Sequence, residues 1–194
     1  MRLMVAHSAR HAILSEIATY VGKSAALRAV IETPKGSRNK YAYDPDGDAF
    51  ALATVLPEGM SFPFDFGFIP STLGDDGDPV DALVLMDAPV PSGCMLECRL
   101  LGVIEAHQKN KGKPWIRNDR LIAVARHARA HNTVNTLREL PRPILHDIQA
   151  FFVDYNRLDD KKFHPLGVRG PRRAEKLVKK GIAVFKKQRR DAQK

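Results

Sequence analysis

The order of apolar segments constrains the fold of this chain more than any other feature. Short segments rich in β-branched and apolar residues are separated by turns of Gly, Pro and Asp, and they predict strands at residues 29–32, 41–43, 49–55, 82–87, 94–105 and 121–125. Helical periodicity follows at residues 133–140 and 143–156. Strands followed by helices predict an α+β fold, and closing the sheet on itself would remove its exposed edges.

The densest group of acidic residues lies directly before one of these apolar segments. Residues 75–81 have the sequence DDGDPVD. Gly77 permits a tight turn and Pro79 biases Asp78 toward an extended backbone, so that Asp76 and Asp78 can project to one side. With Asp81 they would offer hard oxygen ligands, which suit magnesium better than zinc. The alternative is a solvated turn rich in Asp and Gly.

The hexapeptide at residues 76–81, DGDPVD, resembles a known family. It matches position for position the form D-G-D-P-x-D of the soluble family I inorganic pyrophosphatases. The resemblance runs from about residue 30 to residue 171, through the segments 30–37, 62–69, 121–124 and 151–155. The chain is therefore identified as a divergent member of that family. The resemblance implies an OB-like closed five-stranded β-barrel flanked by helices, and magnesium-dependent hydrolysis of inorganic pyrophosphate to two phosphates.

The resemblance also implies roles for individual acidic residues. Asp76 and Asp81 would bind the activating metal ions, and Asp78 would orient the nucleophilic water, accept its proton and contact metal as well. Glu32 resembles a metal-shell carboxylate, and Asp119 lies in the segment that supplies later metal ligands. The implied cofactor is Mg²⁺, with Mn²⁺ or another divalent ion as a substitute.

Pyrophosphate is a polyanion, so cationic and hydrogen-bonding side chains are expected around it. By resemblance, Lys40 binds phosphate, Arg120 supplies a second cation, and Tyr155 donates a hydrogen bond to the leaving phosphate. Two alternatives stay open: Lys40 belongs to a solvated basic loop, and Tyr155 is an amphipathic residue at a helix end. Glu32 is more informative, because an acid within an apolar strand needs a partner.

Several positions depart from the family pattern, namely Ala42, Thr54, Phe66, Gln108, Asn118 and Asn156. Thr54 replaces an arginine and Asn156 a lysine, and Asp119 is one residue out of step with the family's metal segment. Each lost charge-assisted contact is worth roughly 1.5–3 kcal/mol, so we expect weaker substrate binding. Two alternatives follow: a related phosphoanhydride hydrolase with another substrate, and a catalytically weak pyrophosphatase-like protein that binds anions or a partner.

The net charge of +9 is concentrated at one end of the chain. Residues 169–194 hold eleven Lys or Arg and two acids, so the remainder is neutral. An interrupted apolar stripe predicts a basic helix docked on the body. We divide the chain into an N-terminal extension (1–28), predicted to be helical, a pyrophosphatase-like domain (29–171) and a basic C-terminal helix or tail (172–194). Nucleic acid is not expected as a partner, because the tail lacks interleaved aromatic residues and a nucleic-acid motif.

The remaining features concern compartment and assembly. No apolar run reaches 18 residues, which predicts no membrane insertion. Cys94 and Cys98 are predicted to lie on one face of a strand as core thiols and not as a disulfide, and the expected compartment is the reducing cytoplasm. Residues 44–48, DPDGD, predict a hairpin turn. A homo-oligomer is implied by the family resemblance.

Overall fold

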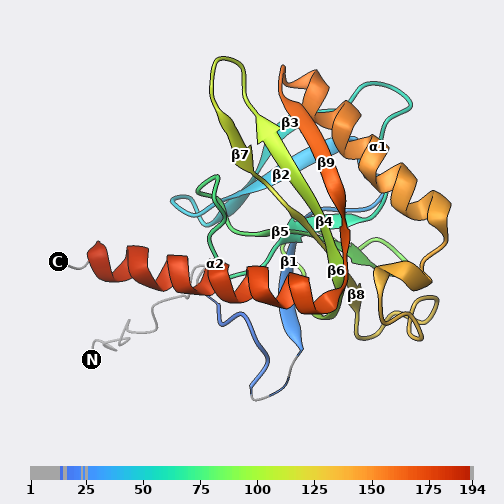
Figure 1. Cartoon of the computed structure of the whole chain (residues 1–194), viewed down its shortest axis with the longest axis horizontal. Coiled ribbons are helices and arrows are strands. Elements are labelled where there is room, and N and C mark those ends of the chain that lie inside the picture. The colour runs from blue at the N-terminus through green and yellow to red at the C-terminus, as the bar shows by residue number, and fades with distance from the viewer. Residues whose placement is uncertain (1–13, 15–16, 23, 25, 193–194) are drawn as a thin grey trace, which may run out of the picture.

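The computed structural model describes residue 14, residues 17–22, residue 24 and residues 26–192. In chain order, the elements are β1 (Leu27–Thr33), β2 (Asn39–Asp44), β3 (Ala49–Val55), β4 (Asp65–Phe68), β5 (Asp81–Leu85), β6 (Met95–Lys109), β7 (Trp115–Arg117), β8 (Arg120–Ala125), the short 3₁₀ helix η2 (Leu137–Glu139), α1 (Arg142–Leu158), β9 (Lys162–Arg169) and α2 (Pro171–Asp191). Strands dominate the first two thirds of the chain and the two long helices the last third (Figure 1). This is the predicted α+β arrangement.

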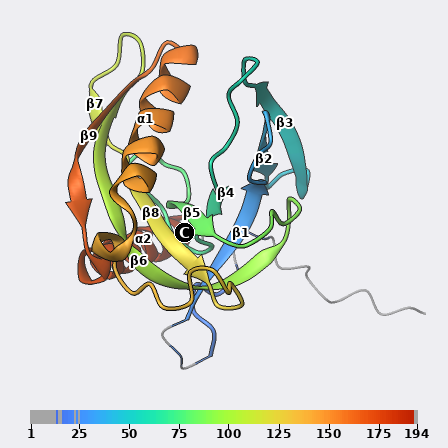
Figure 2. The same ribbon diagram turned by 90° about the vertical axis from the view of Figure 1, so that its right-hand side faces the viewer.

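Five strands form a ring-like sheet. The order β1, β4, β5, β8, β6 returns to β1 through a β1–β6 pairing (Figure 2). Only the β5–β8 contact in this ring is parallel, so the chain must cross over between these two strands. β7 and β9 extend the sheet by pairing with β6, while β2 and β3 form a separate hairpin. The ring corresponds to the predicted five-stranded OB-like architecture.

The core fills this ring and the space between it and the helices. β5 and β8 are buried along almost their whole length, as expected for strands covered on both faces. β1 and β4 approach each other very closely at Gly67, where a Cβ atom would lie 1.9 Å from the carbonyl oxygen of Val30. Glycine is therefore required at that position for the two strands to pair.

The two helices cover different parts of the sheet. α1 packs beside β9 through Ile148 and Phe152, which are fully buried. α2 packs along β6 and buries Ala174 and Val178, while Gly181 lies against Thr72 and Val80. The C-terminal turns of α2 extend past the sheet (Figure 1). No helix among the described residues is long and apolar enough to cross a membrane.

Three strands escaped the sequence analysis: β4, β7 and β9. β4 has four residues and β7 three, which is too short for a period-two pattern to emerge. β9 contains Pro165 and Gly167, residues that argue against a strand, and its pairing with β6 is irregular where Pro165 faces Ala106. The helix predicted at residues 133–140 was wrong in extent, because only the 3₁₀ turn η2 forms there.

Other local predictions have mixed outcomes. The hairpin turn at residues 44–48 is confirmed, since it joins β2 to β3. Cys98 is buried as predicted, whereas Cys94 is half-buried and precedes β6; both are free thiols. The helix predicted within residues 1–28 falls largely outside the described residues, and β1 already begins at Leu27.

Candidate active site

The register of the sheet brings an acid and a base together at one end of the ring. Asp81 is the first residue of β5 and Arg120 the first of β8. Because these strands are parallel, with Ala82 opposite Leu121, their first residues are neighbours. Arg120 Nη1 lies 2.5 Å from Asp81 Oδ2. Two residues predicted for the site from distant parts of the sequence therefore form a direct ion pair.

The loop between β4 and β5 holds two further predicted carboxylates, Asp76 and Asp78. It is closed by a hydrogen bond of 2.7 Å from the Gly74 N–H to the Asp78 carbonyl oxygen. Gly77 has φ of 93°, the left-handed conformation that glycine adopts at little cost. Asp76 Oδ1 accepts the Asp78 N–H at 3.3 Å. The predicted tight turn is thus present, and it gathers both acids beside Asp81.

Electrostatics show that these carboxylates act on one another. Burial raises the pKa of Glu32 to about 7; a hydrogen bond from the Tyr43 N–H opposes the rise, and the charge of Asp81 adds to it. Burial and the charge of Asp81 likewise raise the pKa of Asp76 to about 6. Burial also raises the pKa of Asp81, although Arg120 counteracts this effect. The negative charge of Asp81 thus repels the carboxylates of Glu32 and Asp76, and a bound cation would relieve this repulsion.

Lys40 and Tyr155 adjoin these carboxylates. Burial lowers the pKa of Lys40, but the neighbouring Tyr155, Asp81 and Glu32 outweigh it, so the pKa is raised and the ammonium stays charged. Lys40 and Tyr155 are close enough for each to shift the pKa of the other. Burial raises the pKa of Tyr155, which keeps its hydroxyl protonated and able to donate. Lys40 lies on β2 and Tyr155 on α1, so the hairpin and the helix both contribute to the site.

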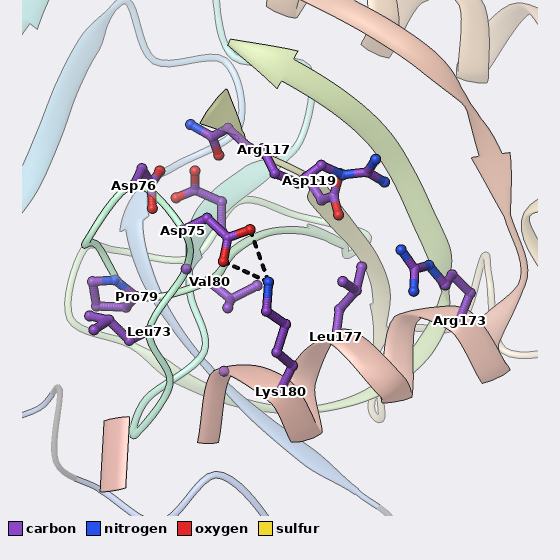
Figure 3. A pocket seen from close by; sticks show the side chains of 14 residues that line it. Leu73, Asp75, Asp76, Pro79, Val80, Arg117, Asp119, Arg173, Leu177 and Lys180 are labelled. Atoms are coloured by element: carbon purple, nitrogen blue, oxygen red, sulfur yellow. Dashed lines mark hydrogen bonds and ion pairs between the residues drawn. The ribbon is translucent and has the colours of Figure 1, made fainter. Parts of the chain in front are cut away.

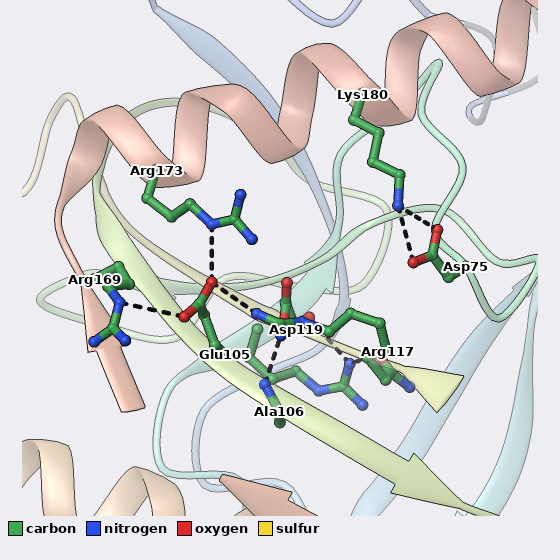
Figure 4. Close-up of polar contacts among 10 residues, drawn as sticks. Asp75, Glu105, Ala106, Arg117, Asp119, Arg169, Arg173 and Lys180 are labelled. Carbon is green, nitrogen blue, oxygen red and sulfur yellow. Dashed lines mark hydrogen bonds and ion pairs between the residues drawn. The ribbon is translucent and has the colours of Figure 1, made fainter. Parts of the chain in front are cut away.

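The segment leading into β8 places alternate side chains on opposite sides. Arg120 Nη1 donates to Asn118 Oδ1, and Asn118 Nδ2 donates to Gln108 Oε1 at 3.0 Å. Asp119 instead accepts hydrogen bonds from the Ala106 N–H at 2.9 Å and from an arginine at position 117 (Figure 4). In an extended chain, side chains two positions apart point to the same side, so Asn118, and not Asp119, shares a side with Arg120. This alternation is the sequence signal that would have identified Asn118.

The structure therefore brings together seven of the eight predicted site residues. These are Glu32, Lys40, Asp76, Asp78, Asp81, Arg120 and Tyr155. Asp119 belongs to a different network, in which Arg117 Nε lies 2.5 Å from its Oδ1. Asn118 and Gln108 were noted in the sequence only as departures from a family pattern; Asn118 contacts Arg120, and Gln108 contacts Asn118.

A cavity of about 390 Å³ extends from the cluster toward α2. Asp76, Asp81 and Asp119 all line this cavity, and Figure 3 shows Asp76 and Asp119 among the side chains around it. Across the cavity, Lys180 of α2 forms hydrogen bonds of 2.6 and 2.9 Å with the carboxylate of Asp75. The cavity thus gives access to the carboxylates from the side of the C-terminal helix.

Two of the sequence departures have a structural consequence. Asn156 is buried, and its amide donates to the Phe152 carbonyl oxygen at 2.8 Å. This side chain serves the helix backbone and does not replace a cation. Thr54 stands opposite Lys40 in the β2–β3 hairpin, so the position that lost an arginine lies beside the phosphate-binding lysine candidate.

The donor set suits a hard divalent cation. The acids Glu32, Asp76, Asp78 and Asp81 offer only oxygen ligands, the preference of Mg²⁺ and Mn²⁺. Within the part of the chain that the structure describes, no three acid, His or Cys side chains are already grouped at metal-binding distances. The carboxylates are therefore near one another, but their oxygen atoms are not yet arranged around one common metal position.

Comparison with known proteins agrees with this arrangement. The model of the inorganic pyrophosphatase family matches residues 29–186. The chain belongs to the inorganic pyrophosphatase family. It is 34% identical over 164 residues to an inorganic pyrophosphatase of Synechocystis, covering 84% of this chain and 94% of the relative. It is 39% identical over 133 residues to that of Thermus thermophilus, covering 69% and 73%.

Solved pyrophosphatase structures share the fold. The crystal structure of the Thermus thermophilus enzyme superposes with a TM-score of 0.83 at 33% identity, covering 90% of this chain and 99% of the other. The pyrophosphatase of Helicobacter pylori gives a TM-score of 0.78 at 32% identity, covering 86% and 98%. The family predicted from residues 76–81 is therefore confirmed, together with the ring-like sheet and its flanking helices.

Proposed function

We propose that this protein hydrolyses inorganic pyrophosphate to two phosphates with the help of divalent metal ions, Mg²⁺ being the natural one. The observation that carries the proposal is the convergence of Glu32, Asp76, Asp78 and Asp81 on the cations of Lys40 and Arg120, in a chain of this family. Four acids against two cations leave the site negative, and a divalent ion would offset that charge. The positive side chains then face the polyanionic substrate.

Each residue has a distinct task in this proposal. Glu32, Asp76 and Asp81 hold metal, and metal, when bound, lowers the pKa of a water molecule and neutralises phosphate charge. Asp78 orients the attacking water and accepts its proton. Lys40 and Arg120 bind phosphate oxygens, and Tyr155 donates to the leaving phosphate. Asp119 is a weaker candidate ligand, because Arg117 and the Ala106 N–H already engage its carboxylate.

Compartment and assembly are part of the same proposal. We place the protein in the cytoplasm, where nucleotide-consuming reactions release pyrophosphate and where its free thiols Cys94 and Cys98 would stay reduced. We also propose a homo-oligomer, which light scattering coupled to size-exclusion chromatography would test. A molar mass equal to that of one 21.6 kDa chain would contradict it.

The decisive experiment measures phosphate release from pyrophosphate with and without Mg²⁺. Asp78→Asn keeps the size of the side chain but cannot accept the proton, so we expect turnover to fall at least about 100-fold, the lower range for loss of a general base. Asp75→Asn is the matched control: it lies in the same loop, and Lys180 engages its carboxylate away from the cluster. Turnover that survives Asp78→Asn, or a folded parent protein without magnesium-dependent turnover, would refute the proposal. A parallel panel of nucleotides and polyphosphate tests the related phosphoanhydride hydrolase.

A further inference from the structure

Arg120 is held more tightly than a substrate-binding arginine requires. Only 4% of the residue is exposed, and its guanidinium carbon lies 5.2 Å from the ring centre of Phe152 and 5.5 Å from that of Phe163. Asp81 and Asn118 both engage the same nitrogen, Nη1. Aromatic faces, an amide and a carboxylate thus fix the plane of the guanidinium from different elements.

A chain of buried amides continues behind this arginine. Asn118 Nδ2 donates to Gln108 Oε1 at 3.0 Å, and Gln108 Nε2 in turn donates to Asn110 Oδ1 at 3.3 Å. Gln108 and Asn118 are each 9% exposed, so neither exchanges its partner for water easily. The Asn118 N–H is itself bound to the Ala106 carbonyl oxygen at 3.0 Å, which anchors the amide to β6. The acceptor that faces Arg120 is therefore rigidly placed.

We propose that Asn118, supported by Gln108 and by the rings of Phe152 and Phe163, forms a socket that fixes Arg120 and thereby sets how Asp81 is shared between this arginine and a divalent cation. Asn118 and Gln108 are positioning residues, because they act through Arg120. The inference deepens the proposed function and rests on it.

The geometry gives the direction of the effect. A guanidinium has five N–H donors in a planar fork and can grip a carboxylate through two of them at once. With Asn118 holding Nη1, Arg120 contacts one oxygen of Asp81 through that shared nitrogen. Without the amide, the fork is free to turn onto both Asp81 oxygens and to compete with a cation for them. The socket therefore keeps an Asp81 oxygen available to metal.

The socket also preserves a donor for substrate. Among the described residues, Arg120 Nε is buried without a hydrogen-bond partner. A buried, unsatisfied donor on a charged group is costly, and an anionic oxygen is its natural acceptor. If the guanidinium turned onto both oxygens of Asp81, the Nε–H of Arg120 would no longer point toward the position expected for a phosphate oxygen. Loss of the socket should therefore raise the KM for pyrophosphate more than it lowers kcat.

Asn118→Leu tests the socket with a side chain of similar size and no acceptor. Titration calorimetry with Mg²⁺ alone, in the absence of pyrophosphate, should show binding weakened by about tenfold or more, the usual effect of removing a residue that orients a metal ligand. Asn118→Asp restores an oxygen acceptor for Arg120 and should bind Mg²⁺ at least as well as the parent protein. Because Asn118 lines the same cavity as Asp76 and Asp81, the new carboxylate would also offer Mg²⁺ a ligand of its own, so the decisive comparison is between Asn118→Leu and the parent protein.

Asn135→Leu is the matched control. Arg99 Nη1 donates to Asn135 Oδ1 at 2.7 Å in a similar arginine–asparagine pair near the other end of β6, so this variant should leave Mg²⁺ affinity and KM unchanged. If Asn118→Leu fails to fold, Gln108→Leu gives the same test, because Gln108 is hydrogen-bonded to Asn118, which in turn is hydrogen-bonded to Arg120. We expect it to weaken Mg²⁺ binding less than Asn118→Leu does, because Gln108 acts on Arg120 only through Asn118.

Each outcome bears on a different claim. Parental Mg²⁺ affinity and parental KM in folded Asn118→Leu, or in Gln108→Leu where only that variant folds, would overturn the socket while leaving pyrophosphate hydrolysis intact. Failure of the parent protein to hydrolyse pyrophosphate would instead refute the proposed function, and the Mg²⁺ titration would still report on the socket.

Discussion

Glu105 provides a sharp test of how the sheet and α2 are joined. Its carboxylate on β6 is approached by arginines from three other segments: Arg117 Nη2 at 2.7 Å, Arg173 Nε at 2.8 Å and Arg169 Nε at 3.3 Å (Figure 4). The Glu105 side chain is only 11% exposed. Glu105→Gln removes the charge while keeping the size of the side chain, so three guanidiniums lose one shared counter-charge.

The three contacts differ in weight because they differ in burial. The side chain of Arg117 is 26% exposed, and its pair with Glu105 should contribute about 1–2 kcal/mol, less than a fully buried pair because Asp119 remains beside it. Arg173, at 44% exposed, donates a charge-assisted bond worth about 1 kcal/mol after screening. Arg169, at 56%, contributes about 0.5 kcal/mol. The loss is about 3 kcal/mol, or a fall in Tm of about 6–12 °C.

The same carboxylate predicts a pH dependence of known sign. Burial raises the pKa of Glu105, but the hydrogen bond from Arg173 and the charges of Arg117 and Arg169 outweigh it, leaving the pKa lowered. A lowered pKa in the folded state stabilises the protein above the unfolded-state pKa, about 4.3, and this contribution is lost as the pH falls through the folded-state value. The difference in free energy of unfolding between the parent protein and Glu105→Gln should therefore be largest at pH 7 and become smaller as the pH falls.

Urea unfolding at pH 7 and at a series of lower pH values measures this difference directly. Glu97→Gln is the control, because the Glu97–Arg126 pair also joins a β6 carboxylate to an arginine but has a 67% exposed arginine. Its cost should stay below about 1 kcal/mol. A Glu105→Gln cost no larger than that of Glu97→Gln, or a cost that does not shrink in acid, would refute the reasoning.

Two further predictions concern the core. Gly67→Ala should lower the free energy of unfolding in urea by at least about 3 kcal/mol, because the new methyl group meets backbone atoms of β1. Gly170→Ala, with open space around it, should lower it by less than about 1 kcal/mol. Equal losses would contradict the close approach of β1 and β4. Burial raises the pKa of Cys98 to about 12, so iodoacetamide at pH 8 should label one thiol per native chain, Cys94, and two after unfolding; rapid labelling of both in the native protein would show that Cys98 is exposed.

The sequence predicted the parts of the fold that have a local signal. The long strands and the amphipathic helix α1 follow from periodicity, and the β2–β3 hairpin follows from the turn residues between them. β4 was missed because its four residues are all buried and carry no alternation. β9 was missed because tertiary pairing with β6 overrides the local preference of Pro165 and Gly167. The family resemblance, and not periodicity, supplied the ring.

The candidate site was predictable wherever one short segment determined its geometry. The turn around Gly77 brought Asp76 and Asp78 together as expected. Asp119 was predicted as a metal ligand by family resemblance, one residue out of step with the family's segment, whereas the direction of side chains along the chain places Asn118 against Arg120. The role of Gln108 depends on the pairing of β6 with its neighbours, which no local pattern encodes.

The placement of Asp81 and Arg120 shows why this site depends on the whole ring. The two residues are 39 positions apart and meet only because β5 and β8 are parallel neighbours. That pairing requires the chain to leave β5, run out along β6 and return through β7 before β8 can dock. Arg120 is then held by rings from α1 and β9, which enter later still. The loop that carries Asp76 and Asp78 can form its turn locally, but Arg120 reaches Asp81 only in the complete sheet. If these acids bind metal as we propose, the affinity for metal should report on tertiary assembly and not on the loop alone.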